Sequence, residues 1–258
     1  VNVTKAHINE VFASFLEKIE KGIEKAIELG NGIVPTYLTH EAVDFEPVTA
    51  ANGEPVISHY GLQKAKVKEF KTIPLPYFLE GPARMMGYMD ADDARKLFNA
   101  VKETDIYDKK LAMYKTSASI EKCSMENGRC RAFTPGWQER ENVFLHMEYK
   151  YILAMIKAGL YDEYYDTITR ALIPFLDPNM YGRSTLENSS FLASSVNPNE
   201  DVHGRGFVAR LSGSTTEMIS MWIEMMMGGK VFTYEDGKLV LNFDPKLANW
   251  LFDEGKVT

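Results

Sequence analysis

The sequence predicts a mainly α-helical fold that ends in a short β-hairpin. Apolar residues recur at helical spacing in several segments, and long polar loops connect these segments. Near the C-terminus the pattern changes to two short apolar runs on either side of an Asp-Gly turn. Helices joined in this way suit an α/α toroid, in which paired helices bury one another and the loops at one end build a site.

The first helix is expected at about residues 5–29. Its apolar side chains recur every three or four residues, and Gly30-Asn31-Gly32 ends the pattern. Residues 33–76 contain several prolines and alternate poorly, so they are expected to form a loop with short strands or turns. A connection of this length often carries function.

The remaining helices are recognised by their apolar periodicity and by residues that cap or end them. Asp90 is the expected cap of one, and Gly159, Pro174 and Gly228-Gly229 stop others. The expected ranges are 77–89, 91–102, 141–158, 161–172 and 214–227. A hairpin follows at 230–243. We therefore divide the chain into a helical (α/α) barrel portion, residues 1–229, and a β-hairpin tail, residues 230–258, which leads to a C-terminal β region.

Composition places the chain among soluble globular proteins of the cytoplasm. The net charge is 29 − 36 = −7, which disfavours nucleic acid and anionic membranes as partners. Cys123 and Cys130 fit no disulfide framework or zinc pattern and are expected to be free thiols. We expect neither a metal nor an organic cofactor. No apolar run is long enough to span a membrane. We expect no signal peptide before the first helix.

The segment Gly204–Glu217 predicts an anion site. Ser214 and Glu217 have the spacing of a capping box, which makes Ser214 the expected N-cap of the last helix. Backbone N–H groups and the positive end of the helix dipole would then converge at Ser212, Gly213 and Ser214, where an anion such as phosphate can bind. The alternative is an ordinary capped core helix.

A second cluster, Thr134–His146, combines the groups that bind sugars and anions. Trp137 could stack on the apolar face of a sugar, and hydrogen bonds to its hydroxyls could come from Gln138, Glu139, Arg140 and Asn142. His146 could pair with an anion. The alternative is that Trp137 and His146 belong to the core and the charges face solvent. In the loop 181–191, Arg183 and Glu187 are further candidates for substrate contacts.

With both clusters in view, the chain resembles the inverting glycoside phosphorylases of the cellobiose phosphorylase family. The pattern P-G-x-x-E-x-x-x-x-F-x-H, from Pro135 to His146, is similar to the family's P-G-I-K-E-N-G-G-I-F-x-H segment. Arg210-Leu-Ser-Gly-Ser214 is similar to its W-L-T-G-T segment. The loop segments 175–191 and 203–215 point to a long-chain, cellobiose phosphorylase-like subgroup. The resemblance spans roughly residues 5–250 and is specific from 128 to 227.

The resemblance implies an (α/α)6 barrel, of which this chain supplies about half the helices. It also implies that phosphate cleaves a β-linked glucoside, with inversion, to give glucose 1-phosphate. Carried over from the family, His146, Ser212 and Gly213 hold the phosphate, Ser214 lies beside them, and Glu139 contacts sugar. The family's lysine and glycine pair are absent between Gln138 and Asn142, and its threonine is replaced by Ser212, which leaves the sugar unspecified.

The family's general acid, an aspartate in a D-W-N-D motif, is expected upstream of Val1. No such motif occurs in the 258 residues, so we expect a fragment that is inactive alone and that associates with the rest of its parent chain or with further copies of itself. Alternative functions are an inverting glycoside hydrolase, a glucan-synthase domain or a non-catalytic carbohydrate-binding module. The phosphorylase hypothesis predicts that the loops 33–76, 128–140 and 177–204 lie at one end of the helices and that His146 is close to Ser212.

Overall fold

The computed structural model describes residues 3–208 and 213–252. The chain forms two compact units. One contains the residues up to Thr36 and from Pro76 onward, and the other is Tyr37–Leu75. The boundary expected at residues 229 and 230 falls inside the first unit.

The N-terminal helix α1, Lys5–Leu29, confirms the expected range. Thr4 caps it by accepting a hydrogen bond from the His7 backbone N–H, and the chain turns away at Gly30 and at Gly32, whose φ is +91°. None of its residues is buried, and its apolar stripe is open to solvent. The helix therefore presents an unpartnered apolar face within the described part of the chain.

The unit Tyr37–Leu75 is a β-hairpin, not the expected loop with short elements. Strand β1 (Leu38–Pro47) pairs antiparallel with β2 (Ala65–Pro74), with Leu38 opposite Pro74 and Pro47 opposite Ala65. Both strands expose side chains on both faces, so the alternation of apolar and polar residues that reveals a half-buried strand is missing. The prolines stand at strand ends, where they remove no interior hydrogen bond.

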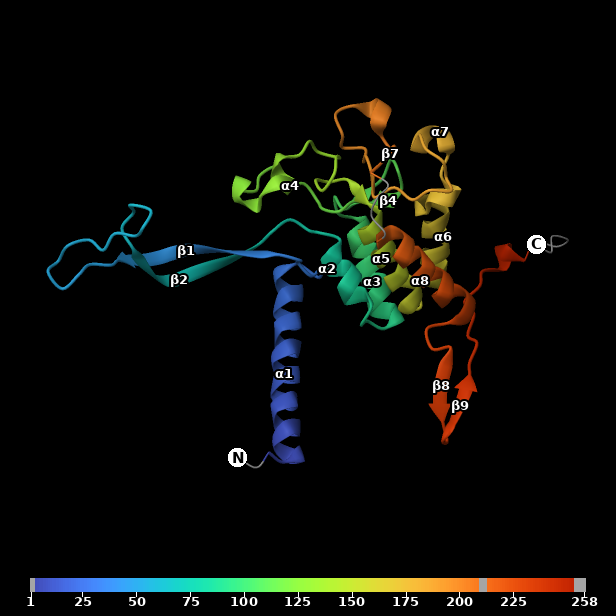
Figure 1. Cartoon of the computed structure of the whole chain (residues 1–258), viewed down its shortest axis with the longest axis horizontal. Coiled ribbons are helices and arrows are strands. Elements are labelled where there is room, and N and C mark those ends of the chain that lie inside the picture. Colours follow the sequence, from blue (N-terminus) through green and yellow to red (C-terminus); the bar gives the residue numbers. More distant parts are fainter. Residues whose placement is uncertain (1–2, 209–212, 253–258) are drawn as a thin grey trace. The chain divides into compact units, whose positions relative to one another are not determined.

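The core of the first unit surrounds one central helix, α5 (Figure 1). Nine of its side chains are buried, and it packs against α2, α6 and α8. The bounds of the larger helices are α2 Glu80–Met86, α3 Ala91–Lys102, α5 Leu145–Lys157, α6 Tyr161–Ala171 and α8 Gly213–Met227. Because α5 is enclosed by other helices, its periodicity is blurred by apolar residues on several faces.

The ranges of α3, α6 and α8 agree with expectation, and Asp90 caps α3 through the backbone N–H groups of Asp92 and Asp93. Helix α2 is shorter than expected. Helix α5 begins at Leu145 and not near Glu141, because Val143–Phe144 forms a strand, β5. Two residues expected in the helix, Val143 and Phe144, therefore belong to a β-sheet.

Three short strands from distant parts of the chain form the sheet that positions the candidate site. Strand β6 (Phe191–Leu192) lies between β5 and β7 (Gly206–Phe207), with both pairs antiparallel. A second small pair joins β3 (Tyr107–Asp108) and β4 (Met113–Tyr114). The short helices in the loops are η1 Met125–Asn127, α4 Arg129–Ala132, η2 Ile173–Phe175, α7 Pro178–Tyr181, η3 Glu200–Val202 and η4 Asn249–Leu251.

The expected C-terminal hairpin is confirmed. Strand β8 (Phe232–Glu235) pairs with β9 (Lys238–Leu241), and Asp236 and Gly237 both have positive φ, as a tight turn of this kind requires. The described residues thus form a mainly helical fold with small antiparallel sheets and no closed barrel. Among them, no helix has the length and apolar character needed to cross a membrane.

Candidate functional site around His146 and the start of α8

The imidazole of His146 lies directly against the backbone at the start of α8. A Cβ atom on Gly213, the first residue of α8, would be 2.4 Å from His146 Nδ1 and 2.5 Å from Cγ. Glycine is therefore required for this close approach. Since His146 is the second residue of α5, the two helices begin side by side. The sequence analysis expects His146 close to Ser212, which lies outside the described residues; the contact seen here is with the adjacent Gly213.

Ser214 is not the N-cap of α8, because the helix already begins at Gly213. Its side chain is buried, and its Oγ has no hydrogen-bond partner among the described residues. Glu217, expected to complete a capping box, instead places Oε1 3.4 Å from His146 Nε2. The first turn of α8 thus presents a buried hydroxyl and, in any α-helix, backbone N–H groups without partners inside the helix.

The three-stranded sheet brings the two sequence clusters together through a row of aromatic rings. Phe144 of β5 stacks on Phe191 of β6, with 4.8 Å between ring centroids, and Phe191 stacks on Phe207 of β7 at 5.5 Å. Trp137 lies parallel to Phe207 at 3.8 Å. At the other end, the Phe144 ring is perpendicular to that of His146, 5.8 Å away. The row connects Trp137 to His146 and fixes the ring planes by packing.

Loops 128–140 and 177–204 meet, as the sequence predicts. The Ser194 backbone N–H donates to the Gly136 carbonyl, and the Ser194 hydroxyl donates to the Glu141 carbonyl. A Cβ on Gly136 would be 2.6 Å from the Asn197 backbone N, so the two loops touch closely there. The third expected loop, 33–76, falls mostly in the separate hairpin unit.

Of the remaining predicted sugar contacts, Glu139, Arg183 and Glu187 form ion pairs with protein side chains. Glu139 forms a two-pronged ion pair with Arg129, at 2.7 and 2.8 Å. Gln138, beside it, has a φ of +52° in the tight turn that follows Trp137. On the other loop, Arg183 and Glu187 pair with each other and are partly exposed.

Arg140 and Asn142 are buried, so the expectation that they bind sugar hydroxyls is wrong. Arg140 donates to the carbonyls of Arg131 and Phe133 and pairs with Glu121. Asn142 accepts from the Thr116 hydroxyl. Their polar groups hold the loops because buried polar groups need partners inside the protein.

Three residues of this region lack a functional prediction from sequence. Asn188 reaches the first turn of α8, with Nδ2 3.4 Å from the Thr215 hydroxyl. Glu217 faces His146, and Lys150 lies one turn after His146 on α5. Glu217 and Lys150 both line a hollow of about 360 Å³ between α2, α5 and α8. The i, i+4 spacing of His146 and Lys150 indicates from the sequence that Lys150 lies on the same helix face as His146.

Glu148 is a fully buried carboxyl that does not open to this hollow. Its Oε1 accepts the Tyr114 backbone N–H at 2.8 Å, and Oε2 has no partner among the described residues. Burial raises its pKa to about 8, an effect that the Tyr114 N–H partly opposes. Enclosed in the core, it has no contact with solvent through which to meet a substrate.

The part of the chain that the structure describes contains no cluster of His, Cys, Asp and Glu suited to a metal ion. The chain matches no protein-family model and no curated protein sequence at a significant level.

Proposed function

We propose that His146 and the start of α8 bind inorganic phosphate, and that the chain carries the phosphate side of a glycoside phosphorylase active site. The reaction is the attack of phosphate on a β-linked glucoside, with inversion, to give glucose 1-phosphate. The helices would then form part of an (α/α)6 toroid in a cytoplasmic protein. Phosphate is a co-substrate here, and the proposal requires no cofactor. The partners are a β-glucoside or oligosaccharide and either the rest of a parent chain or another copy.

The observation that carries this proposal is the contact between the His146 ring and the Gly213 backbone. The positive end of a 15-residue helix favours an anion, and its first-turn N–H groups are donors that point outward. An imidazole held beside them adds a further donor, which carries positive charge when it is protonated. The buried, unpartnered Ser214 hydroxyl is a third group that a phosphate oxygen could satisfy.

The carboxylate of Glu217 competes with phosphate for His146. Its carboxylate lies within 3.4 Å of His146 Nε2, where it attracts a protonated imidazole and repels an anion. Binding of phosphate therefore requires His146 to exchange the carboxylate for a phosphate oxygen. Lys150 lines a hollow together with Glu217 and has no ion-pair partner in the described ranges, so its ammonium would offset part of the negative charge of Glu217.

The sugar would lie along the loops beside this site. Trp137 belongs to the same aromatic row as His146, but Phe207 covers one face of its ring, so only the other face remains for a sugar. Gln138 and Glu139 follow it in the same turn, and Glu139 would have to share its carboxylate with Arg129. Arg183 and Glu187 form a partly exposed pair on the loop between α7 and β6.

The test is a phosphate titration by calorimetry, with wild type compared with three variants. His146→Ala should lose at least tenfold in affinity. Glu217→Gln should bind phosphate more tightly, because the competing charge is removed. His59→Ala, in the separate hairpin unit, is the matched control and should bind as wild type does. Tighter phosphate binding by Glu217→Gln is the most informative result, because a purely structural role for Glu217 predicts no increase in phosphate affinity.

Two results would overturn the proposal. If wild type binds no phosphate at millimolar concentration, the proposed phosphorylase function is rejected. The alternative functions, a hydrolase or a carbohydrate-binding module, are then favoured. If His146→Ala binds phosphate unchanged, the anion lies elsewhere. Turnover is measured separately by incubation with cellobiose, laminaribiose or sophorose plus phosphate and assay of glucose 1-phosphate.

A further inference from the structure

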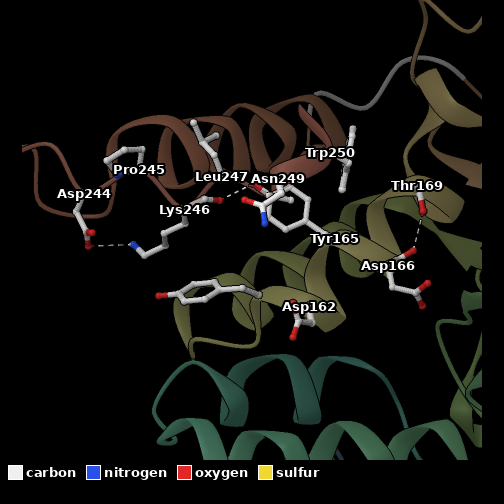
Figure 2. Close-up of a pocket in the computed structure, with 12 residues that line it drawn as sticks. Asp162, Tyr165, Asp166, Thr169, Asp244, Pro245, Lys246, Leu247, Asn249 and Trp250 are labelled. Atoms are coloured by element: carbon white, nitrogen blue, oxygen red, sulfur yellow. Dashed lines mark hydrogen bonds and ion pairs between the residues drawn. The ribbon is translucent and has the colours of Figure 1, made fainter. Parts of the chain in front are cut away.

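A second hollow lies between α6 and the segment that follows β9. Figure 2 shows the residues that line it. Its volume is about 910 Å³, and none of these residues belongs to the site around His146. One wall is α6, and the other is the chain from Asp244 to Trp250, which leads into η4. The volume is within the range of small-molecule sites.

The wall formed by residues 244–250 is tied to the helices on both sides. The Lys246 backbone N–H donates to the Met225 carbonyl of α8, and the Tyr165 hydroxyl of α6 donates to the Lys246 carbonyl. The Lys246 ammonium pairs with Glu224 at 2.9 Å, and both side chains are largely buried. These bonds hold the wall in place, so a ligand meets a largely formed surface.

Aromatic rings line this hollow and remain open to solvent. Trp250 is 50% exposed and meets the Tyr165 ring edge to face, with 5.9 Å between centroids (Figure 2). Tyr161, at the first position of α6, is 42% exposed. Exposed indole and phenol rings next to polar groups bind ligands that have an apolar face and a polar edge. A pyranose ring has this character.

The charged side chains that line the hollow are three carboxylates and one ammonium, which disfavours an anionic ligand. Asp166 pairs with Arg170, and Asp244 lies 3.7 Å from the Lys246 ammonium. Asp162 alone among the lining charges has no ion pair within the part of the chain that is described. Because the other two carboxylates are paired, the free carboxylate of Asp162 and the exposed amide of Asn249 remain to form hydrogen bonds with the hydroxyls of a neutral ligand.

We propose that this hollow binds a neutral oligosaccharide, with Trp250 and Tyr161 stacking on sugar rings and Asp162 and Asn249 accepting or donating hydrogen bonds to hydroxyls. It would act as an anchoring site apart from the proposed phosphate site. The inference is based on the lining residues of this hollow alone, so it survives if phosphate binding at His146 fails.

The experiment follows the indole N–H resonances of the three tryptophans by NMR during titration with laminarihexaose and, separately, cellohexaose. Assignment uses Trp250→Phe and Trp222→Phe. With at least one of the two sugars, the Trp250 signal should shift in a saturable manner at millimolar or lower concentration. Trp222, which is 58% exposed on α8, should not shift and provides the matched control for exposed indoles.

Two variants test the roles of the lining residues. Trp250→Ala should weaken the affinity at least tenfold, and Asp162→Asn should weaken it several-fold. Asp162 is exposed in the first turn of α6, so its substitution leaves the core intact even if Trp250→Ala disturbs folding. Trp222→Phe should bind as wild type does, and Trp250→Ala should retain phosphate binding.

Three outcomes would overturn the inference. The first is that the Trp250 signal shifts with neither of the two hexasaccharides. The second is unchanged affinity in both Trp250→Ala and Asp162→Asn. The third is a larger Trp250 shift with tetramethylammonium than with the sugars at equal concentration, which would identify a cation site.

Discussion

One added methyl group at Gly213 tests the packing on which the proposed phosphate site depends. In Gly213→Ala the new Cβ would lie 2.4 Å from His146 Nδ1, so the ring must retreat by about 1 Å to reach ordinary contact. Glu217 and Phe144 lie on other sides of the imidazole and limit where it can move. Overpacking of this kind costs about 1–3 kcal/mol, and the better helix propensity of alanine offsets up to ~1 kcal/mol. With the full offset, we expect a net loss of about 0–2 kcal/mol.

The assay is a double-mutant cycle in urea, followed by circular dichroism. In a His146→Ala background the methyl group has no ring to strike, so Gly213→Ala should become neutral or slightly stabilising. The coupling between the two positions should therefore be about 1–3 kcal/mol. Gly87→Ala is the matched control, because a Cβ there would meet the Arg84 carbonyl oxygen at an ordinary 3.7 Å. Equal effects of Gly213→Ala in both backgrounds would refute the contact between His146 and α8.

Three further predictions concern stability. Tyr181→Phe should cost about 1–3 kcal/mol in urea unfolding, because the buried hydroxyl bonds both the N–H and the Oγ of Ser189; a neutral result would show that the loop does not depend on it. Asp90→Ala should cost about 1 kcal/mol by removing the cap of α3, with Asp90→Asn as the control that keeps the cap. Burial raises the pKa of Glu148 to about 8, above the 4.5 of an ordinary glutamate. The wild-type free energy of unfolding should therefore fall as pH rises from 4.5 to 8, by at most roughly 1.4 kcal/mol per pH unit. Glu148→Gln should abolish that slope, and an unchanged slope would contradict its assignment.

The sequence predicts elements well where the signal is local. Helix α1 has a clear stripe and a Gly-Asn-Gly end, α3 has Asp90, and the β8–β9 hairpin has Asp236-Gly237. Each depends on residues close together in the chain, so propensity and turn chemistry suffice.

Prediction fails where distant residues decide the structure. Strands β1 and β2 form from their mutual hydrogen bonds, and no buried face marks them in the sequence. The start of α5 is displaced to Leu145 because β5 pairs with β6, almost fifty residues away.

In the candidate site, too, local patterns are predicted well and contacts between distant residues are not. The proximity of His146 to the segment around Ser212 is an expectation from the family resemblance, and in the structure the adjacent Gly213 lies against the His146 ring. The role of Glu217 is missed because its spacing from Ser214 imitates a capping box, whereas the carboxylate faces an imidazole from another helix. Arg140 is misjudged because nothing in the local sequence reveals that Glu121 and two carbonyls surround it.

Because the two ends of the Tyr37–Leu75 hairpin lie next to each other, this segment can be replaced by another. The Leu75 N–H donates to the Tyr37 carbonyl at 3.0 Å, so the chain departs and returns at neighbouring positions. A segment with adjoining ends can be excised and its ends rejoined by a short glycine-containing turn without stretching the backbone on either side. The same architecture would let the hairpin be made longer, shorter or differently charged while the helical unit keeps its own ends in place.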